Sequence, residues 1–435
     1  MKKIAIGLLG LGNVGSGVVK LLSDNADAIE SRLGARVEVK RILVREVDKP
    51  RLVEVDPALV TREVSDLLHD PDIKIVLELI GGDDPAREYV LGAFAAGKHV
   101  VTANKLLLAT HADQLLDAAE QKNVDLFYEA SVCGGVPVLR ALREGLASDR
   151  IDQLLGIVNG TSNYILTKMT DERRAFDEVL REAQAQGYAE ADPALDVDGH
   201  DAHHKLAILV ALSFGTRAPL GSIYREGIRH IAPVDIQYAD RFGYKIKPLV
   251  IARDIDGRIE ARVHPTLIPK RWLLASVDGV FNAVYVSSYA LGHSMYYGRG
   301  AGMMPTAVAV VSDIIEICRD ILAHAPGTAS ARMRRSPRTQ RPFHDIGDLA
   351  SRYYFRFSVL DRPGVLAQIA GVLGEHAISI SEVVQEGKRE GGERPVTVVV
   401  TTHMARERNV QSALAQINRL ASVVERTRLL RILES

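Results

Sequence analysis

Short apolar runs alternate with helical patterns over the first third of the chain. Strands are predicted where apolar residues run together, at 3–9, 37–44, 75–80, 100–102 and 124–128. Helices are predicted where apolar residues recur with helical spacing, at 85–96 and 106–121. Strands that alternate with helices are typical of a parallel sheet covered on both faces. We therefore predict an α/β fold with a doubly wound sheet over residues 1–135.

The pattern becomes mixed after residue 150. Helices are predicted at 176–186 and 201–214, and strands at 244–253, 259–266 and 274–288. Asp254-Ile255-Asp256-Gly257 lies between two of these strands and favours a hairpin turn. An apolar helix is predicted around Pro305-Thr306, because proline is well tolerated in the first turn of a helix. We predict an α+β domain over 136–322, with the helix at 303–322 packing back on the first domain.

The C-terminal pattern is strand, helix, two strands, helix and strand. These elements are predicted at 353–360, 365–375, 378–384, 396–402, 405–420 and 424–433, with a hairpin at Gly391-Gly392. The βαββαβ order is that of a ferredoxin-like domain, which we assign to residues 351–435. This part of the sequence contains no group of residues suited to catalysis, which favours a binding or regulatory role.

Residues 323–350 are predicted to form an exposed linker between the second and third domains. The linker is rich in arginine, with Arg332, Arg334, Arg335, Arg338 and Arg341. No aromatic residues are interleaved with these arginines to stack on bases, so we do not expect a nucleic-acid-binding arm.

Composition adds few constraints. Of the 435 residues, 47% are hydrophobic and 25% are charged, which is ordinary for a soluble globular protein. The formal net charge of −1 argues against a surface built to bind polyanions. The sequence has only 2 cysteines, no apolar run long enough to span a membrane and no signal-peptide pattern. We expect a cytoplasmic protein that binds neither membranes nor nucleic acids.

A glycine motif follows the first predicted strand and opens a helix. Gly10 permits a tight turn, Gly12 lets the backbone approach a pyrophosphate, and Gly15 lets the helix pack on the strand. The N-terminus of the helix favours anionic phosphates. This context predicts that the domain binds a dinucleotide, and a glycine-rich turn in an unrelated α/β domain is the alternative.

The ends of two predicted strands carry residues that are expected to contact the cofactor. Arg45 and Glu46 follow the second predicted strand, where an arginine accommodates the 2′-phosphate of NADP and a carboxylate binds the ribose of NAD. Arg45 favours NADP, Glu46 leaves NAD open, and a solvated ion pair would explain both residues equally well. Lys105 follows another strand, whose carboxyl end should face the ligand crevice. Lys105 is thus expected to reach cofactor or substrate unless it is an ordinary surface lysine.

Charged residues are concentrated between residues 187 and 205. The cluster comprises Glu190, Asp192, Asp196, Asp198, Asp201, His200, His203, His204 and Lys205. Such a cluster suits a cationic substrate, a metal ion or a catalytic lysine. Asp201 and Lys205 lie one turn apart on a predicted helix, as an exposed ion pair or as a lysine positioned by a carboxylate. His200 and His204 have the same spacing and suit a metal, but the carboxylates are better suited to an ammonium group.

The segment around this cluster resembles the signature of homoserine dehydrogenases. The matching residues are Ala183, Gly187-Tyr188, Asp192-Pro193, Asp196-Val197, Gly199-His200-Asp201 and Lys205. Supporting matches are the glycine motif, 102–105, 129–137, 159–163, and Gly300-Ala301-Gly302 with Pro305-Thr306. The C-terminal domain resembles an ACT domain, with Asp361-Arg362-Pro363-Gly364 in its first loop. The resemblance extends over nearly the whole chain.

The resemblance implies reversible reduction of L-aspartate 4-semialdehyde to L-homoserine by NADPH or NADH, a step in threonine, methionine and isoleucine biosynthesis. The first domain would then be of the Rossmann type, and the second would carry catalysis and dimerisation. Lys205 is the implied proton donor, and Asp201 orients it or the substrate. Lys105 is the third implied catalytic residue; it would lie beside the nicotinamide and the substrate, and which of the two lysines delivers the proton stays open. Glu190 and Asp196 are implied to bind the substrate, Glu190 at its ammonium group. The implied cofactor-binding residues are Gly10, Gly12, Asn13, Val14, Gly15, Arg45, Lys105 and Gly302.

The resemblance also implies a monovalent-cation site, usually occupied by sodium. Its ligands would be Glu129 and the backbone carbonyls of Val132, Gly134 and Val136. Cys133 stands where smaller residues are common, which matters little because backbone carbonyls do the binding. The ACT domain implies an amino-acid effector, for which we expect threonine, and a homodimer or homotetramer is expected.

Two other interpretations are compatible with the sequence. One is a non-catalytic NADP-binding sensor that signals through its ACT domain, but a sensor would have no need of Glu190, Asp201 and Lys205. The other alternative is a dehydrogenase for a different amino-acid semialdehyde, which only a substrate test separates from the first interpretation.

Overall fold

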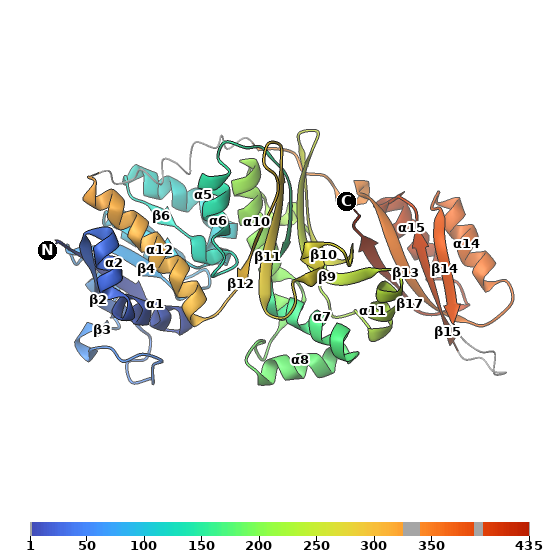
Figure 1. Ribbon diagram of the computed structural model, residues 1–435, viewed down its shortest axis with the longest axis horizontal. Helices are drawn as coiled ribbons and strands as arrows, with labels where there is room; N and C mark the ends of the chain where they lie inside the picture. The colour runs from blue at the N-terminus through green and yellow to red at the C-terminus, as the bar shows by residue number, and fades with distance from the viewer. Residues whose placement is uncertain (1, 325–339, 387–394, 435) are drawn as a thin grey trace.

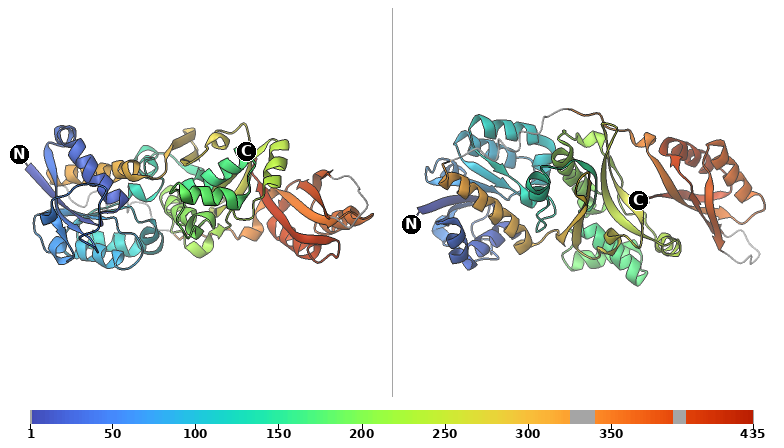
Figure 2. Two further views of the ribbon diagram at one scale, coloured as in Figure 1. Left: turned by 90° about the horizontal axis from the view of Figure 1, so that it is seen from below. Right: turned by 45° about the horizontal axis from the view of Figure 1, so that its top comes forward.

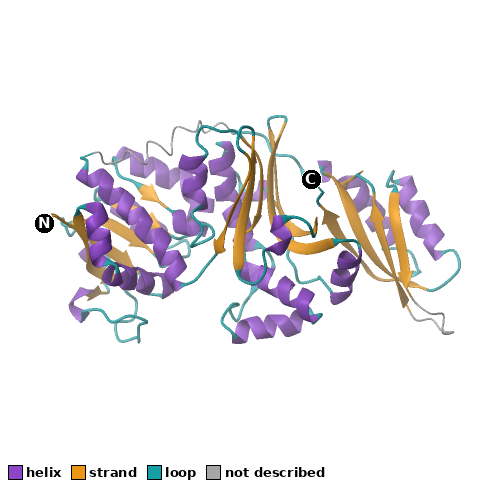
Figure 3. Ribbon diagram, in the orientation of Figure 1, coloured by secondary structure: helices purple, strands orange, loops and turns teal. Residues whose placement is uncertain are grey.

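The computed structural model describes residues 2–324, 340–386 and 395–434. Three regions follow one another along the long axis of the molecule, from an N-terminal through a central to a C-terminal sheet (Figures 1 and 2). Helices pack on each of these sheets (Figure 3). Within the described residues, no helix is both long and apolar enough to span a bilayer.

The N-terminal sheet is parallel and has the strand order β3-β2-β1-β4-β5-β6. Its strands are β1 (Lys2–Leu9), β2 (Ala35–Leu43), β3 (Val60–Thr61), β4 (Ile73–Glu78), β5 (His99–Thr102) and β6 (Leu126–Phe127). Its helices are α1 (Asn13–Asp24), α2 (Ala26–Leu33), α3 (Ser65–Leu68), α4 (Ala86–Ala95) and α5 (Lys105–Gln121). The order confirms the predicted doubly wound sheet. Because it reverses between β1 and β4, a ligand crevice opens at the carboxyl ends of these strands.

Helix α12 (Met303–Leu322) packs against α1, although it follows the central strands in sequence (Figure 1). Ile314 and Ile317 join the buried cluster that contains Ile6 of β1. The approach to α1 is close, because a Cβ atom on Gly17 would lie 2.5 Å from the backbone oxygen of Met303. A glycine at this position therefore lets the chain return to the first sheet.

The central and C-terminal strands form one sheet with the order β12-β11-β7-β9-β10-β17-β13-β15-β14. The central strands are β7 (Ile151–Ile157), β8 (Tyr224–Arg225), β9 (Tyr244–Ile255), β10 (Arg258–Pro269), β11 (Phe281–Ser288) and β12 (Gly292–Arg299). The central helices are α6 (Val138–Arg140), α7 (Gly160–Glu172), α8 (Phe176–Ala185), α9 (Ala194–Val197), α10 (His200–Phe214) and α11 (Pro233–Arg241). The predicted hairpin joins β9 to β10. Asp256 and Gly257 both have positive φ there, which matches the twist of a two-residue hairpin loop.

The strand predicted at 274–288 is wrong in its first half. Residues Leu273–Ser276 form a turn of 3-10 helix, and β11 begins only at Phe281. The carbonyl groups of Val277 and Gly279 accept hydrogen bonds from the side chain of Asn163 on α7 instead of from a neighbouring strand. Apolar spacing carries no information about such side-chain contacts.

The C-terminal elements are β13 (Ala350–Leu360), α14 (Val365–Glu375), β14 (Ile380–Glu386), β15 (Pro395–Thr402), β16 (Ala405–Arg406), α15 (Glu407–Ile417) and β17 (Val423–Ile432). Their order β17-β13-β15-β14 confirms the predicted ferredoxin-like domain. The domain has its own core, in which Phe355 and Phe357 meet Ile369 of α14 and Val410 of α15.

A short parallel ladder joins the two parts of the large sheet. Thr266 and Leu267 of β10 pair with Arg431 and Ile432 of β17. Most of the predicted linker, residues 325–339 with four of its arginines, and the predicted hairpin at 391–392 lie outside the described residues. Beyond the linker, the N–H of His344 donates to the carbonyl of Ile259 at 2.8 Å, so this segment lies beside β10.

Candidate functional site

The glycine motif forms the turn between β1 and α1. Gly10 has a φ of 103°, and a Cβ atom on Gly15 would lie 2.4 Å from the oxygen of Gly10. Only glycine fits both positions. Gly12 caps α1 with open space around it, and Asn13 and Val14 form the first helical turn. The N-terminus of α1 therefore faces the crevice with free room for an anion.

The far end of this crevice is basic. Its lining includes Gly10, Gly12 and Arg45, together with Glu46. Three further cationic residues, Lys49, Arg51 and Arg62, line the same crevice. Arg62 follows β3, which has only two residues and is too short to be predicted from its pattern. The basic character of this end is therefore greater than Arg45 alone indicates.

Lys105 lies at the first turn of α5, at the carboxyl end of β5. Asn104 caps this helix by accepting from the N–H of Leu107 at 3.2 Å, and its amide nitrogen donates to the carbonyl of Gly82 at 2.7 Å. These contacts fix the point at which Lys105 leaves the sheet. The Lys105 side chain is 40% exposed and reaches the central domain, where its Nζ lies 2.9 Å from Oδ1 of Asp201.

Asp201 lies between two lysines that come from different domains. The Nζ of Lys205 donates to Oδ2 of Asp201 at 2.8 Å and to the carbonyl of Val158 at 2.7 Å. Asp201 and Lys205 are 5% and 9% exposed, so this is a buried pair rather than a surface ion pair. Asp201 thus joins the nucleotide-binding domain, through Lys105, to the buried ammonium group of Lys205.

The charges of this group are strongly coupled. Burial alone would raise the pKa of Asp201, but the ammonium groups of Lys205 and Lys105 outweigh it and hold the pKa well below its usual range. Burial alone would lower the pKa of Lys205, but the charge of Asp201 raises it above its ordinary value. Lys205 is consequently protonated at neutral pH despite its burial.

Asn159 connects the carboxylates of the cluster. Its Nδ2 donates to Oδ2 of Asp201 at 2.8 Å and to Oδ1 of Asp196 at 2.7 Å, while its Oδ1 caps α7 by accepting from the N–H of Ser162. Burial raises the pKa of Asp196, although Asn159 opposes this shift. The sequence offered Asn159 only as part of a matching segment, because its role depends on contacts between residues far apart in the chain.

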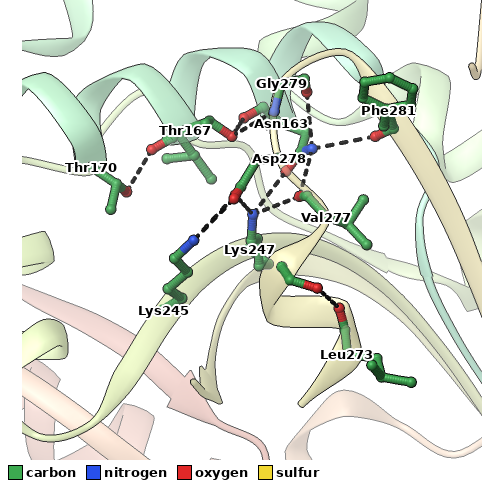
Figure 4. Close-up of polar contacts among 12 residues, drawn as sticks. Asn163, Thr167, Thr170, Lys245, Lys247, Leu273, Val277, Asp278, Gly279 and Phe281 are labelled. Carbon is green, nitrogen blue, oxygen red and sulfur yellow. Dashed lines mark hydrogen bonds and ion pairs between the residues drawn. The ribbon is translucent and has the colours of Figure 1, made fainter. Parts of the chain in front are cut away.

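A polar network anchors the helix that begins next to Asn159 (Figure 4). The Nδ2 of Asn163 donates to the carbonyls of Val277 at 3.0 Å, Gly279 at 2.9 Å and Phe281 at 3.3 Å. The buried Lys247 of β9 donates to the same Val277 carbonyl and to Asp278, both at 2.7 Å. This network holds the start of α7, and with it Asn159, against the loop before β11.

Lys245 reaches the same network from its outer side. Its Nζ lies 3.2 Å from both carboxylate oxygens of Asp278, and its side chain is 26% exposed (Figure 4). Lys247, by contrast, is 2% exposed. Lys247 therefore bridges the sheet and the loop, whereas Lys245 only touches Asp278.

Other residues of the charged cluster do not join the network around Asp201. Glu190 is exposed, and its backbone carbonyl, not its carboxylate, accepts a hydrogen bond from Gln184. Asp192 caps the turn before α9 by accepting from the N–H of Ala194, and Asp198 pairs with Arg229. Nothing in the described structure thus brings Glu190 to Lys205.

The histidines show no metal-binding geometry. No group of three or more histidine, cysteine, aspartate or glutamate side chains in the described structure is arranged to hold a metal ion. His203 donates from Nε2 to the carbonyl of Leu220 at 3.0 Å, and burial lowers the pKa of His204 to about 4. The His200 and His204 spacing therefore reflects packing around the start of α10.

Glu129 lies in a buried loop beside α12. Its carboxylate accepts from the N–H groups of Leu139 at 3.0 Å and Arg140 at 2.8 Å, and its own N–H donates to Asp313 at 2.9 Å. Burial and the charge of Glu129 raise the pKa of Asp313 to about 7. The loop turns sharply next, because Cys133 and Gly134 both have positive φ.

The Gly300–Gly302 segment packs on this loop. A Cβ atom on Gly134 would lie 2.6 Å from the oxygen of Gly300, and the N–H of Gly135 donates to the carbonyl of Arg299 at 3.1 Å. Gly302 then caps α12 with a φ of 125°. The structure thus brings the 129–136 loop and the Gly300–Gly302 segment together.

Family models match most of the chain. The model described as "Homoserine dehydrogenase, NAD binding domain" matches residues 10–129, and that described as "Homoserine dehydrogenase" matches residues 137–315. The model described as "ACT domain" matches residues 353–422. These three matches correspond to the N-terminal, central and C-terminal regions of the structure.

Individual proteins are similar over the full length. Homoserine dehydrogenase of Neisseria gonorrhoeae is 44% identical over 427 residues, which cover 97% of each chain. The crystal structure of a homoserine dehydrogenase from Thiobacillus denitrificans is 44% identical, with a TM-score of 0.92, and covers 100% of this chain and 99% of that one. A hyperthermophilic archaeal homoserine dehydrogenase in complex with NADPH is 26% identical, with a TM-score of 0.60, over 72% of this chain and 97% of that one.

Proposed function

The chain belongs to the homoserine dehydrogenase family, and we propose that it reduces L-aspartate 4-semialdehyde reversibly to L-homoserine with Lys205 as the proton donor. It is an oxidoreductase with an NAD-binding domain of the Rossmann type and an ACT domain. The observation that carries the assignment of roles is the Lys205–Asp201–Lys105 group, in which a buried ammonium is held at the domain boundary.

The bound dinucleotide supplies the hydride that reaches the aldehyde carbon. The carbonyl oxygen must then gain a proton, and an ammonium group one turn into α10 can donate it. Two of the three N–H bonds of Lys205 are directed to Asp201 and Val158, which leaves one for the substrate oxygen. A positioned general acid contributes about 10²–10⁴-fold to the rate. In the reverse direction the neutral amine of Lys205 accepts the proton.

The surrounding residues hold the substrate and the acid. Asp201 keeps Lys205 protonated and orients it, and Lys105 adds a second cation on the cofactor side. Asn159 fixes Asp201 and Asp196, so that Asp196 can bind a polar group of the substrate. Glu190 is proposed to meet the substrate ammonium group; it is exposed, so binding there requires that the 187–192 loop fold over the substrate.

We propose NADP as the preferred cofactor, with Gly10, Gly12, Asn13, Val14, Gly15 and Gly302 around the dinucleotide. Arg45, Lys49, Arg51 and Arg62 place cationic groups around the crevice end where a 2′-phosphate would lie, against a single Glu46. The archaeal relative bound to NADPH adds support. Fluorescence titration tests the preference: NADPH should bind more tightly than NADH, and Arg45→Ala should weaken only NADPH. Equal binding of both cofactors would overturn the assignment.

We propose a sodium ion at the 129–136 loop, bound by Glu129 and the carbonyls of Val132, Gly134 and Val136. The donors fit a hard cation, because all are oxygens and Glu129 is a buried carboxylate. A cation would hold the loop against Gly300. The thermal midpoint should therefore rise in NaCl relative to tetramethylammonium chloride, and Glu129→Gln should abolish this rise. Identical midpoints in both salts would exclude the site.

We propose that the ACT domain binds threonine as a feedback effector. The domain matches the ACT model and is physically joined to the central sheet through β10 and β17. Activity should fall as threonine is added to the full-length enzyme, with methionine and isoleucine as comparisons. An activity that responds to none of the three amino acids would refute this regulation.

We propose that the enzyme forms a homodimer or homotetramer through its central sheet. Three large apolar side chains are more than half exposed on the β11–β12 hairpin: Tyr289 (75%), Leu291 (58%) and Tyr297 (53%). Large exposed apolar groups on one hairpin favour an interface. Sedimentation velocity should give at least a dimer, and Tyr289→Glu with Tyr297→Glu should shift it toward monomer. A monomeric wild-type protein would contradict the proposal.

An assay that follows NADPH absorbance with aspartate 4-semialdehyde tests the substrate. Faster turnover with this substrate than with homologous semialdehydes supports the proposal. Turnover only with another semialdehyde would show that this other compound is the substrate. A protein that binds NADPH without any turnover would be a sensor. A reducing cytoplasm remains the predicted location, and both buried cysteines are unpaired in the described structure.

A further inference from the structure

A cavity lies at the junction of the central sheet and the C-terminal domain. It is lined by β8, the β9–β10 pair, the segment 343–350 and one residue of α10. Its histidine, arginine and glutamate side chains are His203, Arg225, Arg253, Glu260, Arg262 and His344. A bound molecule would therefore contact the central sheet and the segment 343–350, which leads into β13.

The cationic groups of this cavity, the junction cavity, are incompletely paired. Arg262 is 2% exposed and forms an ion pair with Glu260. Arg253 lies opposite Glu260 in the β9–β10 ladder, but no carboxylate in the described structure pairs with it, and its buried Nε has no acceptor. The buried Nε2 of His344 has no partner within the described residues either. Apart from its ion pair with Arg262, Oε1 of Glu260 is also without a hydrogen-bond partner in the described part of the chain, but the guanidinium of Arg253 has no carboxylate beside it there; because buried polar groups are rarely left unpaired, the free Nε of Arg253 points to a missing acceptor.

The junction cavity is connected to the substrate-binding segment. Arg225 lines the cavity, and its guanidinium donates to the carbonyl of Asp198. Three residues further, the N–H of Ile228 donates to the carbonyl of Val197 at 2.8 Å. Val197 and Asp198 lie between Asp196 and the start of α10, which carries Asp201. Arg225 is thus hydrogen-bonded to the backbone that connects Asp196 with the start of α10.

The C-terminal domain contacts the same segment. Arg431 of β17 is 2% exposed and donates to Glu226 at 2.9 Å and to Glu407 of α15 at 2.6 Å. Its guanidinium also lies 4.8 Å from the ring centre of Tyr224, which lines the cavity. The segment 224–228 therefore lies between the C-terminal domain on one side and Val197 and Asp198, at the end of α9, on the other.

We propose that the junction cavity binds a small oxyanion, a carboxylate or a phosphate, between Arg253, Arg225 and His344, and that its occupancy changes substrate affinity through residues 224–228. Guanidinium groups form strong, charge-assisted hydrogen bonds with both oxyanions. The ligand would complete the pairing of Arg253 and hold segment 343–350 against β10. The effect on substrate affinity rests on the proposed function, whereas the binding step does not.

Calorimetric titration of the full-length protein tests the binding, without substrate or cofactor and at constant ionic strength. Inorganic phosphate and acetate are the two probes, and saturable binding of either that Arg253→Gln weakens supports the site and identifies its oxyanion. Arg253→Gln should weaken that binding at least about tenfold, since it removes a charged donor. Arg253→Lys should restore part of it. Arg150→Gln changes an exposed arginine just before β7; it is the control and should bind as wild type does.

Kinetics then test the transmission. The saturating probe should change KM for the semialdehyde in the wild type and in Arg150→Gln, and should leave KM of Arg253→Gln unchanged. Arg253→Gln should keep its basal kcat, which also shows that it is folded. The proposal is overturned if neither probe binds saturably, or if Arg253→Gln binds as tightly as the wild type. Because binding is measured without turnover, failure here leaves the dehydrogenase proposal intact.

Discussion

At the scale of single residues, the chemistry depends on one buried carboxylate that forms ion pairs with two lysines. Asp201 offsets the cost of burying Lys205, and Asn159 fixes the orientation of that carboxylate. The i,i+4 spacing of Asp201 and Lys205 predicts their contact from the sequence. The arrival of Lys105 from another domain does not follow from spacing, and neither does the bridge through Asn159.

Replacing Asp201 by asparagine should change the pH dependence of the reaction. In the wild type the charge of Asp201 raises the pKa of Lys205, so Lys205 stays an acid to high pH. In Asp201→Asn the effect of burial has lost its main opposing charge, so the pKa of Lys205 falls. The rate of aldehyde reduction should therefore fall at lower pH than in the wild type. The measurement is kcat/KM between pH 6 and 10, and an unchanged basic limb would show that Lys205 is not the titrating acid.

At the scale of elements, the apolar pattern predicts long amphipathic helices and misses elements set by side-chain contacts. The βαββαβ domain follows from its pattern because its helices each present one apolar face to a single sheet. Helix α7 is not predicted, since its start is fixed by Asn159 and by the contacts of Asn163 with the loop before β11. The same contacts explain why β11 begins later than its sequence indicates.

The network that anchors α7 should matter for both stability and turnover. Lys247→Met removes a buried donor from the Val277 carbonyl and from Asp278, which should cost about 1–3 kcal/mol in the free energy of unfolding. It should also lower kcat, because Asn159 is no longer held in place. Lys245→Met is the matched control, and as a partly exposed pair it should cost less than about 1 kcal/mol. Denaturant unfolding and steady-state kinetics measure both effects; equal losses in the two variants would contradict the assigned role.

At the scale of the whole molecule, the two-part sheet links regulation to catalysis. Each domain can be predicted separately from its own pattern, but the pairing of β10 with β17 joins strands far apart in sequence and cannot. Arg431 stabilises this junction through ion pairs with Glu226 on one side and Glu407 on the other. The basic end of the cofactor crevice cannot be predicted from the pattern either, because only the folded structure brings Arg62 to it.

Removing Arg431 should weaken the contact between the central and the C-terminal domain. Arg431→Met leaves Glu226 and Glu407 without their cation, and breaking a buried ion pair costs about 3–5 kcal/mol. The thermal midpoint of the full-length protein should fall clearly, and any response to threonine should weaken. Arg426→Met, an exposed arginine on the same strand, should leave both unchanged. Equal midpoints for the two variants would show that Arg431 does not hold the junction.

The central claim is that Lys205, held by Asp201, donates the proton to the substrate. The most direct measurement is the kcat of Lys205→Ala with aspartate 4-semialdehyde, together with its dissociation constant for NADPH. Loss of a positioned general acid should lower kcat by about 10²–10⁴-fold, while NADPH binding stays nearly unchanged because Lys205 lies in the central domain, away from the glycine turn. Turnover retained at the wild-type level would contradict the account and would transfer the acid role to Lys105.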